Sequence, residues 1–73
     1  MSPEKLIYMA NQIATAFASL PEAEAAGNVA SHINDFWAPA MRARLLGIIA
    51  SGGDGLSPVV MRAGAQIRRA APA

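Results

Sequence analysis

The chain has no cysteine and a single histidine, His32, among its 73 residues. Without thiols it can form neither a disulfide nor a thiolate metal site, and one imidazole is too few for an all-histidine site. A domain of this length buries only about 60% of the surface that its unfolded chain exposes. We therefore expect a marginal core that is reinforced by contact with another chain.

Charge is also scarce, because only 15% of the residues are charged and the formal net charge is +1. So weak a field does not steer a protein toward polyanions, which speaks against nucleic acid as a partner. Hydrophobic residues make up 53% of the chain, while an ordinary domain reaches about 45 to 50% with glycine counted. This excess favours packing against another protein or a second copy, since large exposed apolar patches usually mark contact sites.

Long hydrophobic runs are missing as well. The longest apolar run, 45–50, has six residues, whereas a transmembrane helix needs about 20. Polar residues interrupt the first twenty positions, among them Glu4, Lys5, Asn11 and Gln12, so we expect no signal peptide there. The sequence predicts a protein without membrane contact, and the lack of cysteine is compatible with a cytoplasmic location.

The residues that are present favour α-helices. No alternating β-branched pattern is present, and 17 residues are alanine, the best helix former. We predict an all-α fold, a small bundle of three main helices plus a short C-terminal helix, in a single helical domain over 1–73.

The first two helices are predicted from caps and apolar spacing. Ser2 and Pro3 are typical of an N-cap and first helical position, and Pro21 is expected to end the first helix. A second helix should begin near Glu22, whose charge suits a helix N-terminus. The expected inner residues are Leu6, Met9, Ala10, Ile13, Ala14, Phe17 and Leu20 in the first helix, and Ala26, Val29, Ile33 and either Phe36 or Trp37 in the second.

The last two helices follow the same logic. Pro39 opens a third helix, which Gly52 and Gly53 stop before a loop over 51–57. Ser57 and Pro58 then repeat the cap-and-proline signature of a short fourth helix that frays from Arg68 onward. The expected inner residues of the third helix are Met41, Leu45, Ile48 and Ile49, with Arg42 and Arg44 to its sides. Those of the fourth helix are Val60, either Ala63 or Gly64, and Ile67. Leu56, before the serine cap, is expected to pack on Met61.

Candidate chemistry is sparse. His32 and Asp35 lie three residues apart on one helix, the spacing of an acid/base pair, but nothing completes a site, so we interpret them as a surface or interface pair. The glycine-rich segment 52–55 is not followed by the lysine that a phosphate-binding loop requires. The acidic residues are too few for a calcium cage. We expect no catalytic, cofactor-binding or metal site in this chain.

The segment 32–42 is the richest in the chain, because it holds the only tryptophan, the only histidine and one of two phenylalanines. Aromatic residues and arginine are typical of interface hot spots. Adjacent helical residues point about 100° apart, so we expect one of Phe36 and Trp37 in the core and the other at a contact, with either assignment open. The predicted partner interface comprises Tyr8, His32, Asp35, Phe36, Trp37, Met41 and Arg42.

Taken together, segments 2–13, 32–42 and 52–58 give the chain a family resemblance. It resembles the delta subunit of bacterial cytoplasmic NAD-dependent formate dehydrogenases, which are molybdenum- or tungsten-containing multisubunit enzymes. None of the three segments is a catalytic signature, so their combination and order carry the resemblance.

The resemblance implies a non-catalytic accessory subunit of a complex that reversibly oxidises formate to CO2 and reduces NAD. Other chains would hold the bis-pyranopterin molybdenum or tungsten, the iron–sulfur clusters and the FMN. The implied partner is the catalytic alpha subunit, with beta and gamma subunits in the same complex, and the implied role is to stabilise assembly or aid maturation. The competing hypothesis from composition is a free-standing self-associating helical protein or a small DNA-binding regulator.

Overall fold

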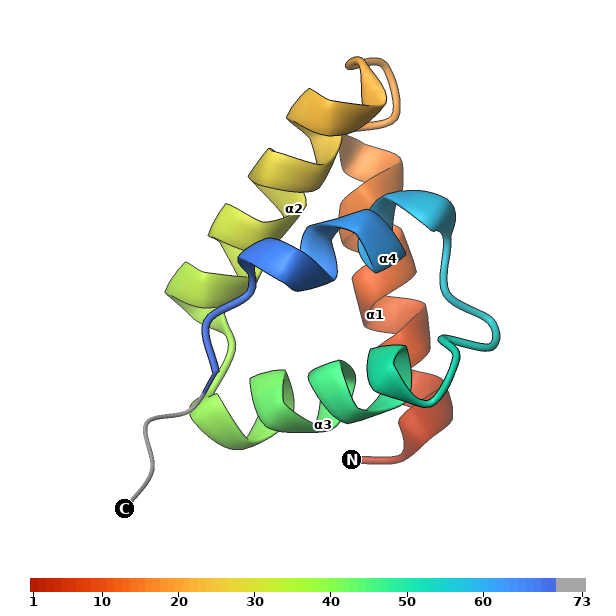
Figure 1. The fold of residues 1–73 in the computed structure, drawn as a ribbon, viewed down its shortest axis with the longest axis vertical. Helices are drawn as coiled ribbons and strands as arrows, with labels where there is room; N and C mark the ends of the chain where they lie inside the picture. Colours follow the sequence, from red (N-terminus) through yellow and green to blue (C-terminus); the bar gives the residue numbers. More distant parts are fainter. Residues whose placement is uncertain (70–73) are drawn as a thin grey trace.

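Four α-helices make up most of residues 1–69, the part of the chain that the computed structural model describes (Figure 1). No strand occurs within these residues. The helices are α1 (Pro3–Ala16), α2 (Glu22–Phe36), α3 (Pro39–Ala50) and α4 (Pro58–Ala63), and a 3-10 turn, Gly64–Gln66, continues α4. The predicted all-α fold with three main helices and a short C-terminal one is confirmed.

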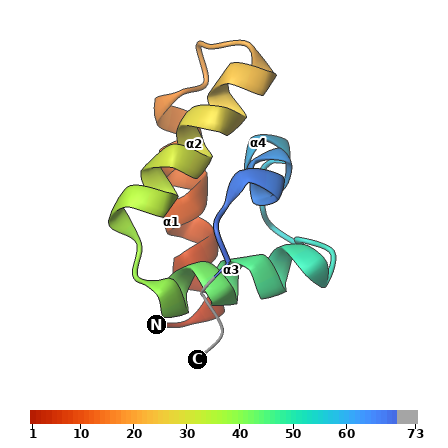
Figure 2. The same ribbon diagram turned by 60° about the vertical axis from the view of Figure 1, so that its left-hand side comes forward.

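The helices are arranged around the hairpin of α1 and α2. These two helices lie side by side, α3 crosses the open end of the hairpin, and α4 packs chiefly against α2 (Figures 1 and 2). The main contact of α3 is with α1 rather than with α2 or α4. One side of α3 is therefore left without a helix packed on it.

Both predicted serine caps are present. The backbone N–H of Lys5 donates to Ser2 Oγ at 3.2 Å, and the N–H of Val60 donates to Ser57 Oγ at 3.4 Å. Each serine precedes a proline at the first helical position, where the missing N–H costs nothing. The signature at the two helix starts was therefore read correctly from the sequence.

The end of α1 differs from the prediction. We expected the helix to run to Pro21 with Leu20 on its inner stripe, but it stops at Ala16. The N–H of Phe17 donates to the carbonyl of Ala14 at 3.1 Å, an i→i−3 bond that tightens the last turn. Leu20 then lies in a turn, where Pro21 disfavours helical backbone for it.

A Schellman motif ends α3 where the glycine pair was predicted to stop it. The N–H of Gly53 donates to the carbonyl of Ile48 at 2.9 Å, and the N–H of Gly52 donates to that of Ile49 at 3.1 Å. Gly52 and Gly53 have φ angles of 116° and 67°. Glycine adopts this left-handed region without the steric penalty that a Cβ brings.

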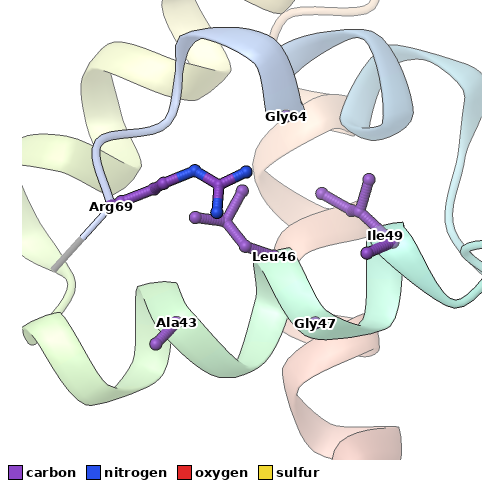
Figure 3. A pocket seen from close by; sticks show the side chains of 7 residues that line it. Ala43, Leu46, Gly47, Ile49, Gly64 and Arg69 are labelled. Atoms are coloured by element: carbon purple, nitrogen blue, oxygen red, sulfur yellow. The ribbon is translucent and has the colours of Figure 1, made fainter.

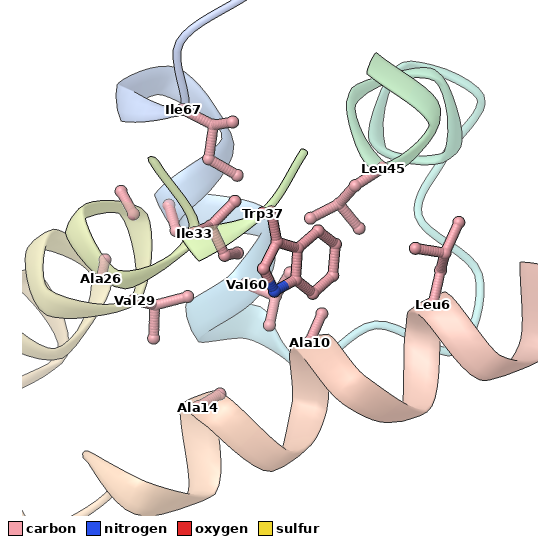
Figure 4. Packing of buried hydrophobic residues seen from close by; sticks show 12 residues of the cluster. Leu6, Ala10, Ala14, Ala26, Val29, Ile33, Trp37, Leu45, Val60 and Ile67 are labelled. Carbon is pink, nitrogen blue, oxygen red and sulfur yellow. The ribbon is translucent and has the colours of Figure 1, made fainter. Parts of the chain in front are cut away.

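One hydrophobic core receives side chains from all four helices (Figure 4). Trp37, in extended conformation directly after α2, places its indole among them with 7% of its surface exposed. The largest fully buried side chains around it are Leu6, Val29, Ile33, Leu45 and Val60. Most predicted inner residues are buried or half-buried, which confirms the helix faces. Ala70 to Ala73, onto which the predicted fraying extends, lie outside the described residues.

Two asparagines attach irregular segments to helices. The Asn11 amide on α1 donates to the carbonyl of Gly55 and its oxygen accepts from the N–H of Ser57, both at 2.9 Å. Asn34 on α2 does the same to Gln66 and Arg68, at 3.0 and 2.7 Å. We call these contacts the Asn11 bridge and the Asn34 bridge. They position the loop after α3 and the segment after α4.

Candidate partner interface

An exposed aromatic pair lies near the end of α2. The rings of His32 and Phe36 are one helical turn apart, with centroids 4.8 Å apart and planes inclined by 38°. Phe36 is 74% exposed, and Asp35 beside it is exposed as well. We call His32, Asp35 and Phe36 the α2 patch. It presents a large apolar ring together with polar groups, a combination that is common at protein interfaces.

The other three predicted residues of this segment face inward. Trp37 is buried in the core, and Met41 and Arg42 are half-buried. The Arg42 guanidinium donates to the carbonyl of Trp37 at 2.9 Å through Nη1 and to that of Arg68 at 3.1 Å through Nε. Arg42 thus connects the end of α2 to the segment after α4. The open assignment of the two aromatic residues is resolved, with Trp37 in the core and Phe36 exposed.

Tyr8 lies on a different helix from the α2 patch. It is 63% exposed on α1, two residues after the buried Leu6. Four of the seven predicted interface residues, Tyr8 and the α2 patch, are therefore accessible to a partner. The prediction that they bind one remains a prediction.

Metal-ligating side chains do not gather in the described part of the chain. No three His, Cys, Asp or Glu residues within 1–69 lie close enough to hold a metal ion. The His32 ring lies against Phe36, and both His32 and Asp35 are exposed. Iron–sulfur clusters are held by cysteine thiolates, and the chain has none, so its side chains do not fit such a cluster.

Two grooves along α3 were missed by sequence reasoning. One has a volume of about 520 Å³ and lies between α3 and the segment after α4 (Figure 3). The other, of about 620 Å³, lies between α3 and the start of α1. The first, which we call the α3 groove, is lined by Ala43, Leu46, Gly47, Ile49, Ala50, Gly64 and Arg69. The second is lined by Pro3, Ile7, Arg44, Gly47, Ile48, Ser51 and Asp54.

A sequence signal for these grooves existed. Residues 39–50 contain only two polar side chains, Arg42 and Arg44, so α3 is apolar nearly all the way round. A helix of this kind is normally buried on all sides, yet Leu45 alone is buried. The mismatch between composition and burial shows that α3 leaves apolar surface exposed.

The sequence of the chain matches a known protein family. The family model described as NADH-dependent formate dehydrogenase delta subunit FdsD matches residues 5–63, which include most of α1 and all of α2, α3 and α4. The chain belongs to this delta-subunit family. It matches no curated protein and no solved structure.

The delta-subunit match confirms the resemblance that the sequence showed. It covers both Asn11 and Asn34, the α2 patch and the α3 helix. The Ser2 cap, Pro3 and the segment after α4 lie outside it. None of the helices in the described part of this delta subunit has the length and apolar content needed to span a bilayer.

Proposed function

We propose that this delta subunit is a non-catalytic accessory chain that binds the catalytic alpha subunit of an NAD-dependent formate dehydrogenase, in a complex with beta and gamma subunits. The family match is the observation that carries the proposal. The chain itself offers no cysteine and a single histidine, and this scarcity of chemically reactive side chains supports an accessory role. Oxidation of formate and reduction of NAD would then take place on other subunits.

We also propose that the cofactors of the complex are bound by its other subunits. The pyranopterin-bound molybdenum or tungsten, the iron–sulfur clusters and the FMN would be held by the larger chains, because the delta subunit lacks suitable ligands for iron–sulfur clusters. A cytoplasmic location is also proposed, on the basis of the composition and the resemblance. The delta subunit would act on the complex by stabilising its assembly or by aiding cofactor insertion.

The α2 patch supports a direct contact with the alpha subunit. Phe36 projects a ring that the fold does not use, and burial of such a side chain contributes about 1.5 to 3 kcal/mol. Asp35 and His32 can supply hydrogen bonds at its edge. Tyr8 on α1 is a further exposed aromatic residue of the type enriched at interfaces.

A tagged pull-down from the native cell extract tests the proposal. Mass spectrometry should identify formate dehydrogenase subunits in the eluate, and the eluate should reduce NAD when formate is added. Phe36→Ser should reduce the yield of these subunits, whereas Glu24→Ala, an exposed change on the same helix, should not. Recovery of the chain alone, as a dimer by light scattering, would instead support the self-associating alternative.

A second measurement separates the two roles. The complex is prepared from cells with and without the delta subunit, and its metal content and subunit composition are determined. A complex that is intact but poor in molybdenum or tungsten indicates maturation. A complex that loses subunits while the remaining alpha subunit is fully loaded indicates assembly.

A further inference from the structure

The α3 helix leaves part of its apolar surface exposed in the described chain. Of its twelve residues only Leu45 is buried, and its main helix contact is with α1. Leu46, Ile48 and Ile49 pack partly against the core and remain half-exposed. Leaving these side chains in water is unfavourable, so the arrangement favours a partner surface.

The backbone of α3 is open to close approach at its centre. Gly47 lines both grooves, and a Cβ atom built on it meets nothing within 4 Å. Small residues allow another backbone to come near, and Ala43 and Ala50 extend this open line one turn in each direction. The larger side chains of Leu46 and Ile49 form the wall of the α3 groove in Figure 3. This shape fits a helix that lies along α3.

Charge on the molecule is divided between its two halves. Residues 39–69 contain five arginines and one aspartate, a net charge of +4, while residues 1–38 contain one lysine and four acidic residues, a net charge of −3. Figure 3 shows the Arg69 side chain extending from the segment after α4 toward the α3 groove, which it lines. Hydrogen bonds within residues 1–69 engage Arg42 and Arg44 but not Arg69. Its guanidinium is exposed at this edge of the groove, where it can meet a carboxylate of a partner.

We propose that the α3 groove binds an amphipathic helix of a partner subunit, whose apolar side packs on Leu46, Gly47 and Ile49 and whose flanking Asp or Glu residues pair with Arg69. This inference rests on the proposed function, because it assigns a second contact to the same partner complex. Complementary charge fixes the orientation of such a helix and excludes basic ones.

The same observations disfavour two other occupants. A second copy of the chain in a symmetric dimer would place two α3 surfaces of net positive charge against each other. A nucleic acid would need several free cations facing its phosphates, while Arg42 is occupied by backbone carbonyls and the groove wall is apolar. An acidic amphipathic helix satisfies both the apolar wall and the charge.

Blocking the groove is the first test. Gly47→Gln fills the open space above α3 without a clash in the chain itself, so the circular dichroism spectrum and Tm of the isolated variant should be retained. Its affinity for the delta-less formate dehydrogenase complex should fall about tenfold or more. Ala23→Gln, the same new side chain at an exposed site near the start of α2, should bind like the wild type.

Charge reversal is the second test. Arg69→Glu should weaken binding at least about tenfold, because it places like charges in contact. Arg62→Glu changes the net charge equally on an exposed position of α4 that lines neither groove, and it should bind nearly as the wild type does. The weakening by Arg69→Glu should shrink at high salt, since screening reduces the repulsion.

The outcomes separate this inference from the proposed function. If wild-type chain binds the complex but Gly47→Gln and Arg69→Glu bind equally well, the α3 groove is not the contact and the proposed function stands. If the wild-type chain binds no formate dehydrogenase subunit, both fail. A wild-type dimer that Gly47→Gln dissociates, or a nucleic acid that Arg69→Glu releases, would assign the groove to that occupant and overturn the proposal.

Discussion

The side-chain oxygen of Asn34 accepts a 2.7 Å hydrogen bond from the backbone N–H of Arg68, while its amide donates to the carbonyl of Gln66. Asn11 repeats this geometry with Ser57 and Gly55. In both cases one carboxamide on an α-helix pairs with a backbone donor and a backbone acceptor that lie two residues apart, outside the α-helices. The two bridges fix the C-terminal half of the chain onto the α1–α2 hairpin.

The Asn34 bridge can be tested by hydrogen exchange. Asn34→Ala should expose the Arg68 amide and accelerate its exchange, because its acceptor is lost. Loss of the two hydrogen bonds should lower the free energy of unfolding by about 1 to 2 kcal/mol. The matched variant Asn11→Ala should accelerate the Ser57 amide and leave that of Arg68 unchanged. Equal acceleration of both amides in either variant would mean that global unfolding, not a local bridge, controls them.

Adjacent aromatic residues should differ sharply in their effect on stability. Trp37→Ala removes a buried ring from the core and should cost about 3 to 5 kcal/mol. Phe36→Ala removes an exposed ring and should change stability by about 0.5 kcal/mol or less. Urea unfolding of both variants, followed by circular dichroism, measures the difference. Similar midpoints would show that the Trp37 indole does not support the core.

Two arginines on one helix provide another contrast. Arg42→Ala removes two hydrogen bonds from a cation to the carbonyls of Trp37 and Arg68, and we expect a loss of about 1 to 3 kcal/mol. Arg44→Ala removes one exposed contact, to the carbonyl of Met1, and should change stability by about 0.5 kcal/mol or less. Thermal unfolding of the two variants at equal salt checks the ranking. A larger effect of Arg44→Ala would contradict the tethering role of Arg42.

Local signals made most of the fold predictable. Ser2 and Ser57 cap helices because the serine oxygen accepts from a free N–H of the first turn and the fixed φ of the following proline suits the first helical position. Gly52 and Gly53 end α3 because glycine adopts the positive φ angles of the Schellman motif, which is also a local property. The end of α1 was missed because the apolar spacing continues through Phe17 and Leu20 although the backbone bonds there become i→i−3. Spacing alone does not distinguish these two geometries.

Tertiary information was harder to obtain from the sequence. Periodicity could not decide between Phe36 and Trp37, because the answer depends on an extended backbone at Trp37 just beyond the helix. The internal role of Arg42 depends on the segment after α4, which lies 26 residues further along the chain. The α3 groove is built by Gly64 and Arg69 from that same segment. No local pattern contains these contacts, although the apolar composition of α3 indicates an unpaired surface.

Two glycines, Gly47 inside α3 and Gly53 just after its end, should respond oppositely to alanine. Gly53 is buried with φ at 67°, and a Cβ there would collide with the Met61 side chain. Gly53→Ala should therefore lower the free energy of unfolding by about 1 to 3 kcal/mol, from the left-handed backbone and the displaced methionine. Gly47 has helical backbone and open space, so Gly47→Ala should raise it by up to about 1 kcal/mol.

Combining Gly53→Ala with a change at Met61 shows how much of the lost stability comes from the collision and how much from the backbone. In Met61→Ala the side chain that would collide with the new Cβ is gone, so adding Gly53→Ala should then cost only the backbone term of about 1 to 2 kcal/mol. Urea denaturation of the two single variants and the double variant gives the coupling. Full additivity would mean that Met61 moves aside freely and that the left-handed turn alone makes glycine necessary at position 53.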